Sequence, residues 1–326
     1  MPRRRGKQDS RFRTDFVEDR QDNPQPHDTA PEGESADAAL ATCPPFSAAR
    51  LKRQLVVDQT VRFGLVMVIV LLLVPTMVTA AVDQPLTQPE WTNAAMLLAL
   101  AAWLGMAMIN TGAARRLARA TLLMDFDPPR AEAELAGSLK TFALNRTLRI
   151  LLYQRLALLR HREGNYQESG AICHALLAQP LGKAEHVRVP LLLILIEARL
   201  TEGDGVSAYA GIMQLRAQPI ALLESLQLLA LQTRYEVQFG HDDSALSRIA
   251  EKTRMAELMP APQCGAMHAM LATAAKRAAR TDLATWLRQR AELLCTFEQL
   301  DTIDQAWQSA GQMTDAAAAT TEGLSA

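Results

Sequence analysis

Residues 63–82 of this 326-residue chain read FGLVMVIVLLLVPTMVTAAV, and residues 91–114 read WTNAAMLLALAAWLGMAMINTGAA. Neither stretch contains Asp, Glu, Lys, Arg or His. As a helix, an apolar run of about 18 residues or more is long enough to cross the ~30 Å hydrocarbon layer of a bilayer. A core helix of a soluble protein seldom runs so far without a charge, because one face meets water. We therefore expect a two-helix transmembrane hairpin over residues 61–114, with spans at about 63–82 and 91–112.

The charges around this hairpin predict its orientation. Basic residues flank both apolar runs: Lys52, Arg53, Arg62, Arg115, Arg116 and Arg119. The connection between the runs contains Asp83 and Glu90 but no Lys or Arg. Positive charge is retained on the cytoplasmic side of a membrane. We therefore expect both termini in the cytoplasm, the connection outside, and the inner membrane of a bacterial-type cell as the location.

Small residues on one side of the second run predict a packing face. They are Ala95, Ala99, Ala102 and Gly105. Small side chains allow another helix backbone to approach closely within a bilayer. The first span is the expected partner, and a separate membrane protein is the alternative.

Residues 1–50 are predicted to form a disordered cytoplasmic tail. They begin with a basic cluster and continue as an acidic, proline-containing stretch without an apolar period. Such a composition cannot bury enough apolar surface to offset the entropy of ordering the chain. The basic cluster serves as a topology signal or a solvated tail, or it contacts anionic lipid. Residues 311–326 are expected to form a second disordered tail.

Residues 115–310 change to an amphipathic helical period with stops at glycine, aspartate and proline. Three segments share one plan, in which an apolar helix is followed by a glycine-containing turn and a second helix. Their turn glycines are Gly164, Gly203 and Gly240, and Ala279 occupies the same place in a weaker fourth copy. These four positions are 39, 37 and 39 residues apart. A single helical hairpin cannot bury its apolar face alone, so the repetition predicts stacked hairpins.

The first copy resembles the tetratricopeptide repeat (TPR). The matching residues are Tyr153, Leu156 and Ala157 in the first helix, Gly164 and Tyr166 at the turn, and Ser169 in the second helix. Later copies keep Gly203 with Ala208 and Gly240 with Ala245, without the turn tyrosine. The usual TPR period is 34 residues, which is shorter than the period here. The resemblance covers about residues 148–295, and it implies a superhelix whose concave face holds peptides or partner helices.

The predicted fold class is therefore all-α, with a two-helix transmembrane hairpin followed by a TPR-like α-solenoid of about four helical hairpins. Two local details accompany this prediction. Asp127 should cap a helix that begins at Pro128 or Pro129. The apolar run LLLILI, Leu191–Ile196, should be covered by repeats on both sides.

If the repeats stack as TPRs do, polar residues of the first helices should line the concave partner-binding groove. They are Gln154, His161, Glu197, Gln227 and Arg234. The alternative is an ordinary solvated surface.

Other classes of site receive little support from the sequence. With 34 basic and 35 acidic side chains, the chain has a formal net charge of −1 and gives no reason to expect a nucleic-acid partner. The cysteines are far apart and contain no CxxC pair: Cys43, Cys173, Cys264 and Cys295. Cys264 and His268 share a helix face, but two ligands do not make a metal site. No nucleotide-binding, hydrolase or metalloprotease motif occurs, so neither a cofactor nor a metal is expected.

These patterns favour a membrane-anchored cytoplasmic adaptor or scaffold that binds partner proteins and tethers them at the inner membrane. One alternative is a structural accessory subunit of a larger membrane complex, packed through the hairpin against other membrane subunits. A membrane-associated enzyme with an unrecognised site is a third hypothesis.

Overall fold

The structure is a computed structural model that describes residues 46–81, 90–141 and 145–301. Within these ranges the chain is helical and contains no β-strand, which confirms the all-α prediction. Most of the predicted N-terminal tail, the whole predicted C-terminal tail and most of the connection between the apolar runs lie outside the described residues.

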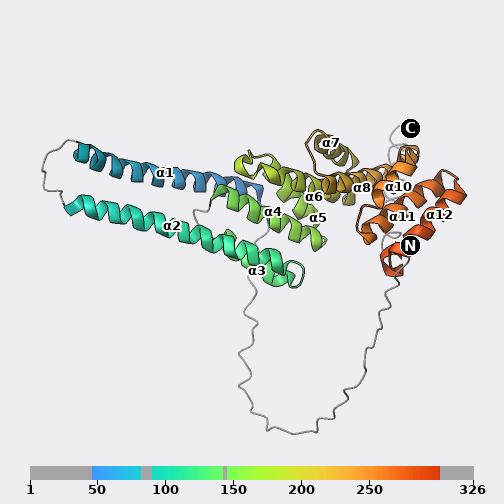
Figure 1. Ribbon diagram of the computed structural model, residues 1–326, viewed down its shortest axis with the longest axis horizontal. Coiled ribbons are helices and arrows are strands. Elements are labelled where there is room, and N and C mark those ends of the chain that lie inside the picture. Colours follow the sequence, from blue (N-terminus) through green and yellow to red (C-terminus); the bar gives the residue numbers. More distant parts are fainter. Residues whose placement is uncertain (1–45, 82–89, 142–144, 302–326) are drawn as a thin grey trace, which may run out of the picture. The chain divides into compact units, whose positions relative to one another are not determined.

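Two long helices are followed by a series of shorter ones (Figure 1). The long helices are α1 (Ala48–Ala81) and α2 (Glu90–Leu123). The shorter elements include one 3₁₀ helix, η1, and follow in the order α3 (Pro128–Leu139), α4 (Arg146–Arg162), α5 (Tyr166–Leu177), η1 (Gly182–Val187), α6 (Arg188–Thr201), α7 (Gly205–Arg216), α8 (Leu222–Gln238), α9 (Asp242–Leu246), α10 (Ile249–Ala256), α11 (Ala261–Arg277) and α12 (Thr281–Leu294).

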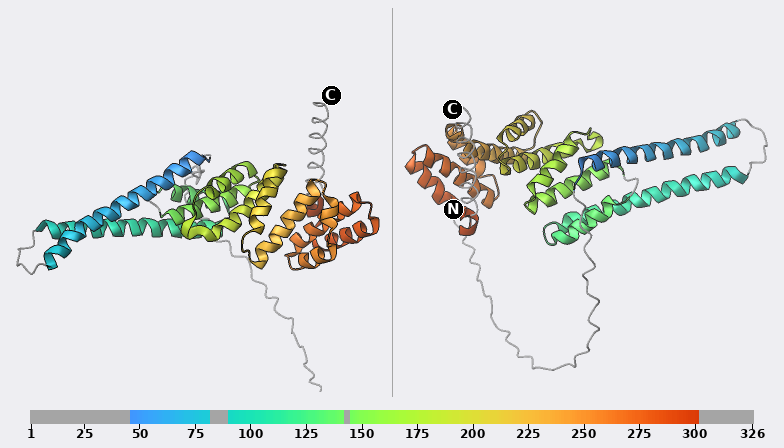
Figure 2. Two further views of the ribbon diagram at one scale, coloured as in Figure 1. Left: turned by 90° about the horizontal axis from the view of Figure 1, so that it is seen from above. Right: turned by 180° about the vertical axis from the view of Figure 1, so that it is seen from behind.

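Helices α1 and α2 extend beyond the predicted spans. Each has 34 residues, which corresponds to about 51 Å at 1.5 Å per residue. They lie side by side in the views of Figures 1 and 2. Helix α1 begins at Ala48, so residues 48–50 belong to a helix and not to the predicted disordered tail. The reason is tertiary packing, because Leu51 and Leu55 are buried in the core that α4 and α5 also form.

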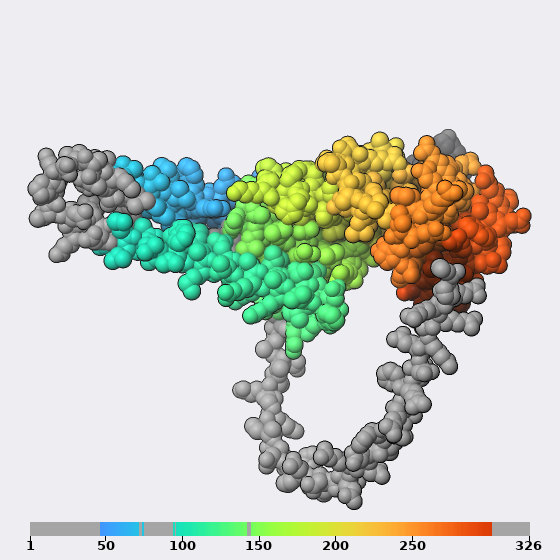
Figure 3. Space-filling view, in the orientation of Figure 1, coloured from blue at the N-terminus to red at the C-terminus, as the bar shows by residue number. Residues whose placement is uncertain are grey.

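Exposed apolar side chains cover the parts of α1 and α2 that carry no charge, and both helices lie at the surface in Figure 3. These side chains are Phe63, Val66, Met67, Val68, Val70, Leu71, Val74, Met96, Leu97, Leu98, Leu100, Trp103, Leu104, Met108 and Ile109. Among the described residues, these two helices are long and apolar enough to cross a membrane, by length and composition alone. Monomeric soluble proteins rarely expose a contiguous apolar surface of this extent.

Half-buried residues at helical spacing mark the sides of α1 and α2 that we infer to face each other. They are Val61, Leu65, Ile69, Ala99, Ala102 and Gly105. A Cβ added at Gly105 would nevertheless meet no atom within 4 Å. The side chain of Ala95 lies outside the described ones. Gly105 therefore has open space beside it, and the packing of the small-residue face against α1 stays a prediction.

A buried ion pair joins α1 to α4. Asp58 of α1 pairs with Arg149 of α4, and each side chain is only 3% exposed. Arg149 also donates a hydrogen bond to the carbonyl oxygen of Thr141 at 3.1 Å. Nearby, the Tyr153 hydroxyl donates to Oε1 of Gln54 at 2.7 Å. Two charges removed from water require each other, so the ion pair fixes the position of α1 along α4.

Further polar contacts tie the hairpin to α4 at the edge of the exposed apolar surface. The Arg62 guanidinium donates to Oδ1 of Asn145 at 3.4 Å, and the Asn145 N–H donates to Oδ1 of Asn110 at 2.9 Å. Arg146 donates to Oε1 of Gln59 at 3.2 Å. Helices α1, α2 and α4 therefore meet at one polar joint.

Helix α3 begins as the sequence predicts. The Asp127 carboxylate accepts a hydrogen bond from the N–H of Arg130 at 3.2 Å, and proline occupies the first turn. A carboxylate at this position satisfies a backbone donor that the helix itself leaves unpaired. Because α3 packs against both α2 and α4, it closes the joint from a third side.

The predicted turns recur with one geometry. Gly164, Gly203, Gly240 and Ala279 have φ values of 78°, 78°, 74° and 57°. The next residue in each turn donates its N–H to the carbonyl five residues earlier: Asn165 to Arg160, Asp204 to Arg199, His241 to Glu236 and Arg280 to Ala275. This is the pattern of a helix that ends in a left-handed residue. Four helix pairs therefore follow one local plan, namely α4 with α5, α6 with α7, α8 with α9, and α11 with α12.

The apolar run on α6 connects two cores. Leu191 belongs to the core shared with α4 and α5, whereas Leu192 and Ile196 belong to the core shared with α7 and α8. All three side chains are fully buried. The prediction that helices on both sides cover this run is confirmed.

The third helix pair departs from the plan. Its second helix is interrupted after Leu246, where Arg248 takes a left-handed φ of 51° before α10 begins at Ile249. The amphipathic period alone predicts one continuous helix here.

Ala279 is the one position of the four turns where a side chain occupies the left-handed region, and this generates a stability prediction. Ala279→Gly should raise the free energy of unfolding by about 1 kcal/mol, because an L-residue pays a steric cost at positive φ. The matched control is Gly240→Ala, where a Cβ would meet nothing within 4 Å. This variant should lower the free energy of unfolding by a similar amount, because the positive φ alone disfavours a side chain there. Urea unfolding of the full chain in detergent, followed by circular dichroism, measures both changes. A change of the same sign in both variants would contradict the assignment of a shared turn.

The buried ion pair generates a second prediction. Asp58→Leu and Arg149→Met each leave the other charge buried without this partner, and each should cost about 3–5 kcal/mol. The double variant Asp58→Leu with Arg149→Met removes both charges and should recover most of that loss. A double-mutant cycle on the unfolding free energy measures the coupling. If the two single changes add without coupling, the pair does not hold α1 on α4.

Candidate functional site

Three of the five predicted groove residues come together on consecutive first helices. Nε2 of His161 on α4 lies 3.1 Å from Oε2 of Glu197 on α6. Arg234 on α8 lies 3.9 Å from the other oxygen of Glu197 and donates to Oγ1 of Thr201 at 3.1 Å. The ring of Tyr166 packs edge-on against His161, with centroids 5.1 Å apart. One carboxylate therefore links two nitrogen donors across three helices.

The cluster is largely satisfied within the chain. Burial lowers the pKa of His161 from its ordinary value of 6.5, although the Glu197 carboxylate acts in the opposite direction. Burial also lowers the pKa of Arg234, but an arginine side chain stays charged. A ligand at this place would have to displace these contacts. The arrangement therefore serves first to hold α4, α6 and α8 together.

The other two predicted groove residues do not take part in this cluster. Gln154 on α4 and Gln227 on α8 are half-buried, and the contacts that define the cluster do not include them. Three of the five residues therefore contact one another, and the groove itself stays a prediction.

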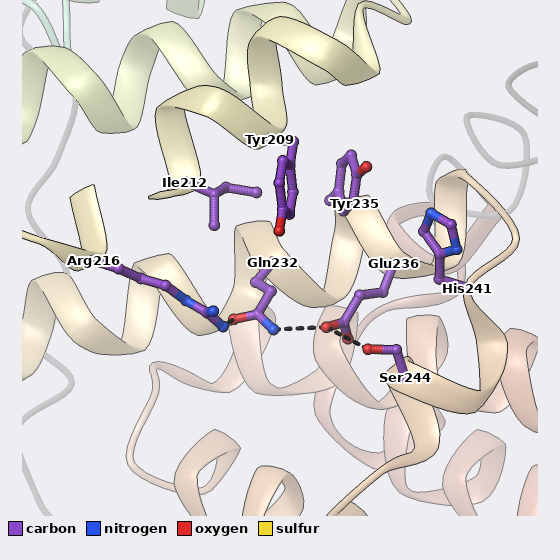
Figure 4. A pocket seen from close by; sticks show the side chains of 8 residues that line it. All are labelled: Tyr209, Ile212, Arg216, Gln232, Tyr235, Glu236, His241 and Ser244. Atoms are coloured by element: carbon purple, nitrogen blue, oxygen red, sulfur yellow. Dashed lines mark hydrogen bonds between the residues drawn. The ribbon is translucent and has the colours of Figure 1, made fainter. Parts of the chain in front are cut away.

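A cavity of about 370 Å³ opens between α7, α8 and α9 (Figure 4). Its apolar wall consists of Tyr209 and Ile212 from α7 and Tyr235 from α8. The two tyrosine rings are 5.6 Å apart and tilted by 33°. Tyr235 also stacks near His241 at the rim, with centroids 5.8 Å apart. Tyr209 is half exposed, so the wall faces solvent on one side.

The opposite side of the cavity is polar. Arg216 donates to the side-chain oxygen of Gln232, and Gln232 donates to Oε1 of Glu236 at 2.6 Å, as Figure 4 shows. Ser244 donates to the same oxygen at 3.0 Å. Lys252 pairs with Oε2 of Glu236 at 2.9 Å. Since Glu236 and Lys252 are both buried and neutralise each other, Arg216 carries the positive charge of the cavity.

The sequence analysis missed this cavity, although one signal was present. Helix α7 carries exposed apolar side chains at Val206, Tyr209 and Met213, on the side opposite its buried Ala208 and Ile212. A helix with apolar residues on both sides contacts something besides its own core. The contact between Tyr209 on α7 and Tyr235 on α8 cannot be predicted from the sequence around either residue.

Two cysteines come close where α11 begins and α12 ends, namely Cys264 on α11 and Cys295 just after α12. Sγ of Cys295 would lie 2.2 Å from a Cβ added at Gly265, the neighbour of Cys264. Burial raises the pKa of the Cys264 and Cys295 thiols, and it raises that of Cys173 to about 12. A thiol that holds its proton is a poor nucleophile and metal ligand. Among the described residues, no group of three His, Cys, Asp or Glu side chains could hold a metal ion.

Comparison with known proteins gives no relatives for this chain. No protein-family model matches it, and neither a curated protein nor a solved structure shows significant similarity to it.

The buried His268 generates a prediction about pH. Burial, aided by the nearby Arg290, lowers the pKa of this imidazole from its ordinary value of 6.5, and neither ring nitrogen has a hydrogen-bond partner in the described structure. The unfolded chain therefore binds a proton first, and stability falls as the pH drops below about 6.5. Each such histidine contributes up to about 1.4 kcal/mol per pH unit.

Urea unfolding of the full chain between pH 5 and 8 tests this dependence. His268→Leu should make the curve shallower below pH 6.5. The matched control is Met267→Leu at the neighbouring buried position, which should shift stability by the same amount at every pH. An unchanged slope in His268→Leu would show that this imidazole does not carry the effect.

Proposed function

We propose that this protein is a membrane-anchored adaptor of the bacterial inner membrane. In this proposal α1 and α2 cross the bilayer as a hairpin. The helix pairs from α4 to α12 form a TPR-like solenoid in the cytoplasm, where they bind partner proteins and hold them at the membrane. The carrying observation is the combination of an exposed apolar hairpin with the buried Asp58–Arg149 pair and the polar joint that fix it to the helix pairs.

The exposed apolar surface supports the membrane location. On α1 it begins at Phe63, which is 67% exposed, and on α2 it includes Trp103, which is 59% exposed. Transferring such side chains from water to hydrocarbon is favourable at about 25 cal/mol per Å². The polar joint adjoins this surface on both helices, at Arg62 just before it on α1 and at Asn110 just after it on α2. This is expected where the hydrocarbon layer ends.

The distribution of charge supports the cytoplasmic orientation. Arg62 precedes the apolar part of α1, and Arg115 and Arg116 follow that of α2, whereas the connection contributes Asp83 and Glu90. Basic residues on the joint side place that side in the cytoplasm by the positive-inside rule.

The repeated turns support the TPR-like proposal. Small or hydroxyl-bearing residues stand five positions after the first three turn glycines, and Ser169, Ala208 and Ala245 are all fully buried. The Ser169 hydroxyl donates to the carbonyl oxygen of Ala157 at 2.8 Å, which is a close contact between the two helices of the first pair. Repeats of this kind commonly present surfaces for peptides and partner helices.

The joint explains how anchoring would assist binding. A surface fixed at the membrane raises the effective concentration of a membrane-associated partner, so modest affinity suffices. A flexible linker would dilute this effect, whereas the Asp58–Arg149 pair and its neighbours hold the binding surface in a defined position relative to the hairpin.

The alternative function, an accessory subunit of a membrane complex, has one observation in its favour. Cβ atoms added at Gly64, Gly105 and Gly112 would meet nothing within 4 Å. This unfilled space on α1 and α2 suits close approach by spans of another protein. An enzyme with an unrecognised site is the weakest hypothesis, because the described thiols hold their protons.

A pull-down from membranes separates these functions. The test variant replaces residues 63–109 by a Gly/Ser linker, which removes the apolar surface but keeps Leu51, Asp58 and the polar joint. We expect this variant to be soluble without detergent, because the exposed apolar side chains are gone. It should retain the partners that the full chain recovers.

Three outcomes decide between the proposals. Retention of soluble, exchangeable partners by the linker variant supports the adaptor. Loss of every partner together with residues 63–109 contradicts the adaptor and favours the subunit. A full chain that fractionates as soluble contradicts both.

A further inference from the structure

The cavity between α7, α8 and α9 contains one positive charge, that of Arg216, which no carboxylate of its lining neutralises. Arg216 donates to the neutral amide of Gln232, and within the described part of the chain it forms no ion pair. Glu236, the one carboxylate that lines the cavity, is already neutralised by Lys252 at 2.9 Å. An anionic group entering the cavity would therefore meet an available guanidinium, which binds carboxylates in a bidentate manner.

Acidic residues near the cavity do not compensate Arg216. Asp242 faces Arg277 at 3.7 Å, and neither Asp242 nor Asp243 lines the cavity. By contrast, the cluster of His161 and Arg234 already contains a carboxylate, because Glu197 contacts both of these side chains. The cavity therefore offers a ligand carboxylate the Arg216 guanidinium beside an apolar wall.

The apolar wall defines a second requirement of the ligand. Tyr209 and Tyr235 pack against each other with ring centroids 5.6 Å apart, and together with Ile212 they form one continuous apolar wall of the cavity. A volume of about 370 Å³ accommodates one large side chain, and it lies at the low end for ligand sites. Aromatic walls favour an aromatic or long aliphatic group, through packing and edge-to-face contacts.

The surroundings of the cavity favour a peptide over a small molecule. Val206 is 85% exposed and Met213 is 45% exposed, and with Tyr209 they form an apolar row along α7 that continues outside the cavity. A small carboxylic acid would fill the cavity but leave the apolar row on α7 exposed to water. A peptide that inserts one side chain can cover the row with its neighbours.

We propose that this cavity binds an acidic, apolar peptide segment of a partner protein. An aromatic or aliphatic side chain of the peptide enters the cavity and packs against the wall of Tyr209, Ile212 and Tyr235, and a neighbouring Asp or Glu carboxylate pairs with Arg216. The proposal rests on the adaptor function proposed above, and it assigns the contact to α7 and α8 rather than to the first-helix residues expected from the sequence.

Peptide titration of the full chain in detergent micelles tests the site. The probes are fluorescein-labelled, C-terminally amidated peptides GEWEG and GKWKG, followed by fluorescence anisotropy. GEWEG should bind about tenfold more tightly than GKWKG, as expected for one charge-assisted hydrogen-bonded contact. Arg216→Glu should reverse this preference, and Tyr209→Ala should lower the affinity for both peptides.

The matched control is Arg130→Glu, which makes the same charge change at a 70% exposed side chain on α3 and should leave both affinities unchanged. Arg216 and Tyr209 are exposed or half exposed, so their variants should keep the wild-type helical content. Tighter binding of GKWKG by Arg216→Glu than by the wild type would be a gain of affinity, which misfolding cannot produce. If the affinity for GEWEG is the same in wild type, Arg216→Glu and Tyr209→Ala, or if GEWEG does not bind, the site is overturned.

Pull-downs from membranes distinguish this failure from failure of the adaptor function. Partners recovered equally by wild type and Arg216→Glu, with no difference in peptide binding, overturn the site and leave the adaptor standing. Arg216-dependent binding of GEWEG by a chain that recovers no partner supports the site and contradicts the adaptor.

Discussion

The buried pair of Asp58 and Arg149 is the constraint on which the arrangement of this chain depends. It lies where two very different surfaces meet, an apolar hairpin that prefers hydrocarbon and amphipathic helix pairs that prefer water. Neither charge can be buried alone, so α1 and α4 hold one position relative to each other. The contacts at Asn110, Asn145 and Arg146 surround the pair with polar bonds. An ordered joint, rather than a linker, therefore connects the two parts.

Much of the architecture was readable in the sequence because its causes are local. The turn positions follow from glycine at a left-handed residue, and even Ala279 obeys the register that Gly164, Gly203 and Gly240 set. The cap at Asp127 follows from a carboxylate placed before proline. The all-helical class follows from the composition and the helical period. The membrane location, the orientation and the TPR-like superhelix are proposals that the fold supports without testing.

The features that were missed arise between segments distant in sequence. Asp58 and Arg149 are 91 positions apart, and nothing near either residue signals the other. Helix α1 starts at Ala48 because Leu51 and Leu55 find a core on α4 and α5, not because of a local helical signal. His161, Glu197 and Arg234 contact one another, but their mutual pairing depends on how neighbouring helices pack, and their place in a groove stays a prediction. The cavity at Arg216 needs α7, α8 and α9 at once.

The central claim is that the exposed apolar surface of α1 and α2 contacts lipid hydrocarbon. Trp103, which lies within that surface, offers a direct test. A variant with Trp91, Trp286 and Trp307 replaced by phenylalanine would be reconstituted into vesicles of lipids brominated on their acyl chains. The account predicts strong quenching of the Trp103 fluorescence, and none in a matched variant that retains only Trp286. Unquenched Trp103 emission in vesicles that contain the folded protein would contradict the account.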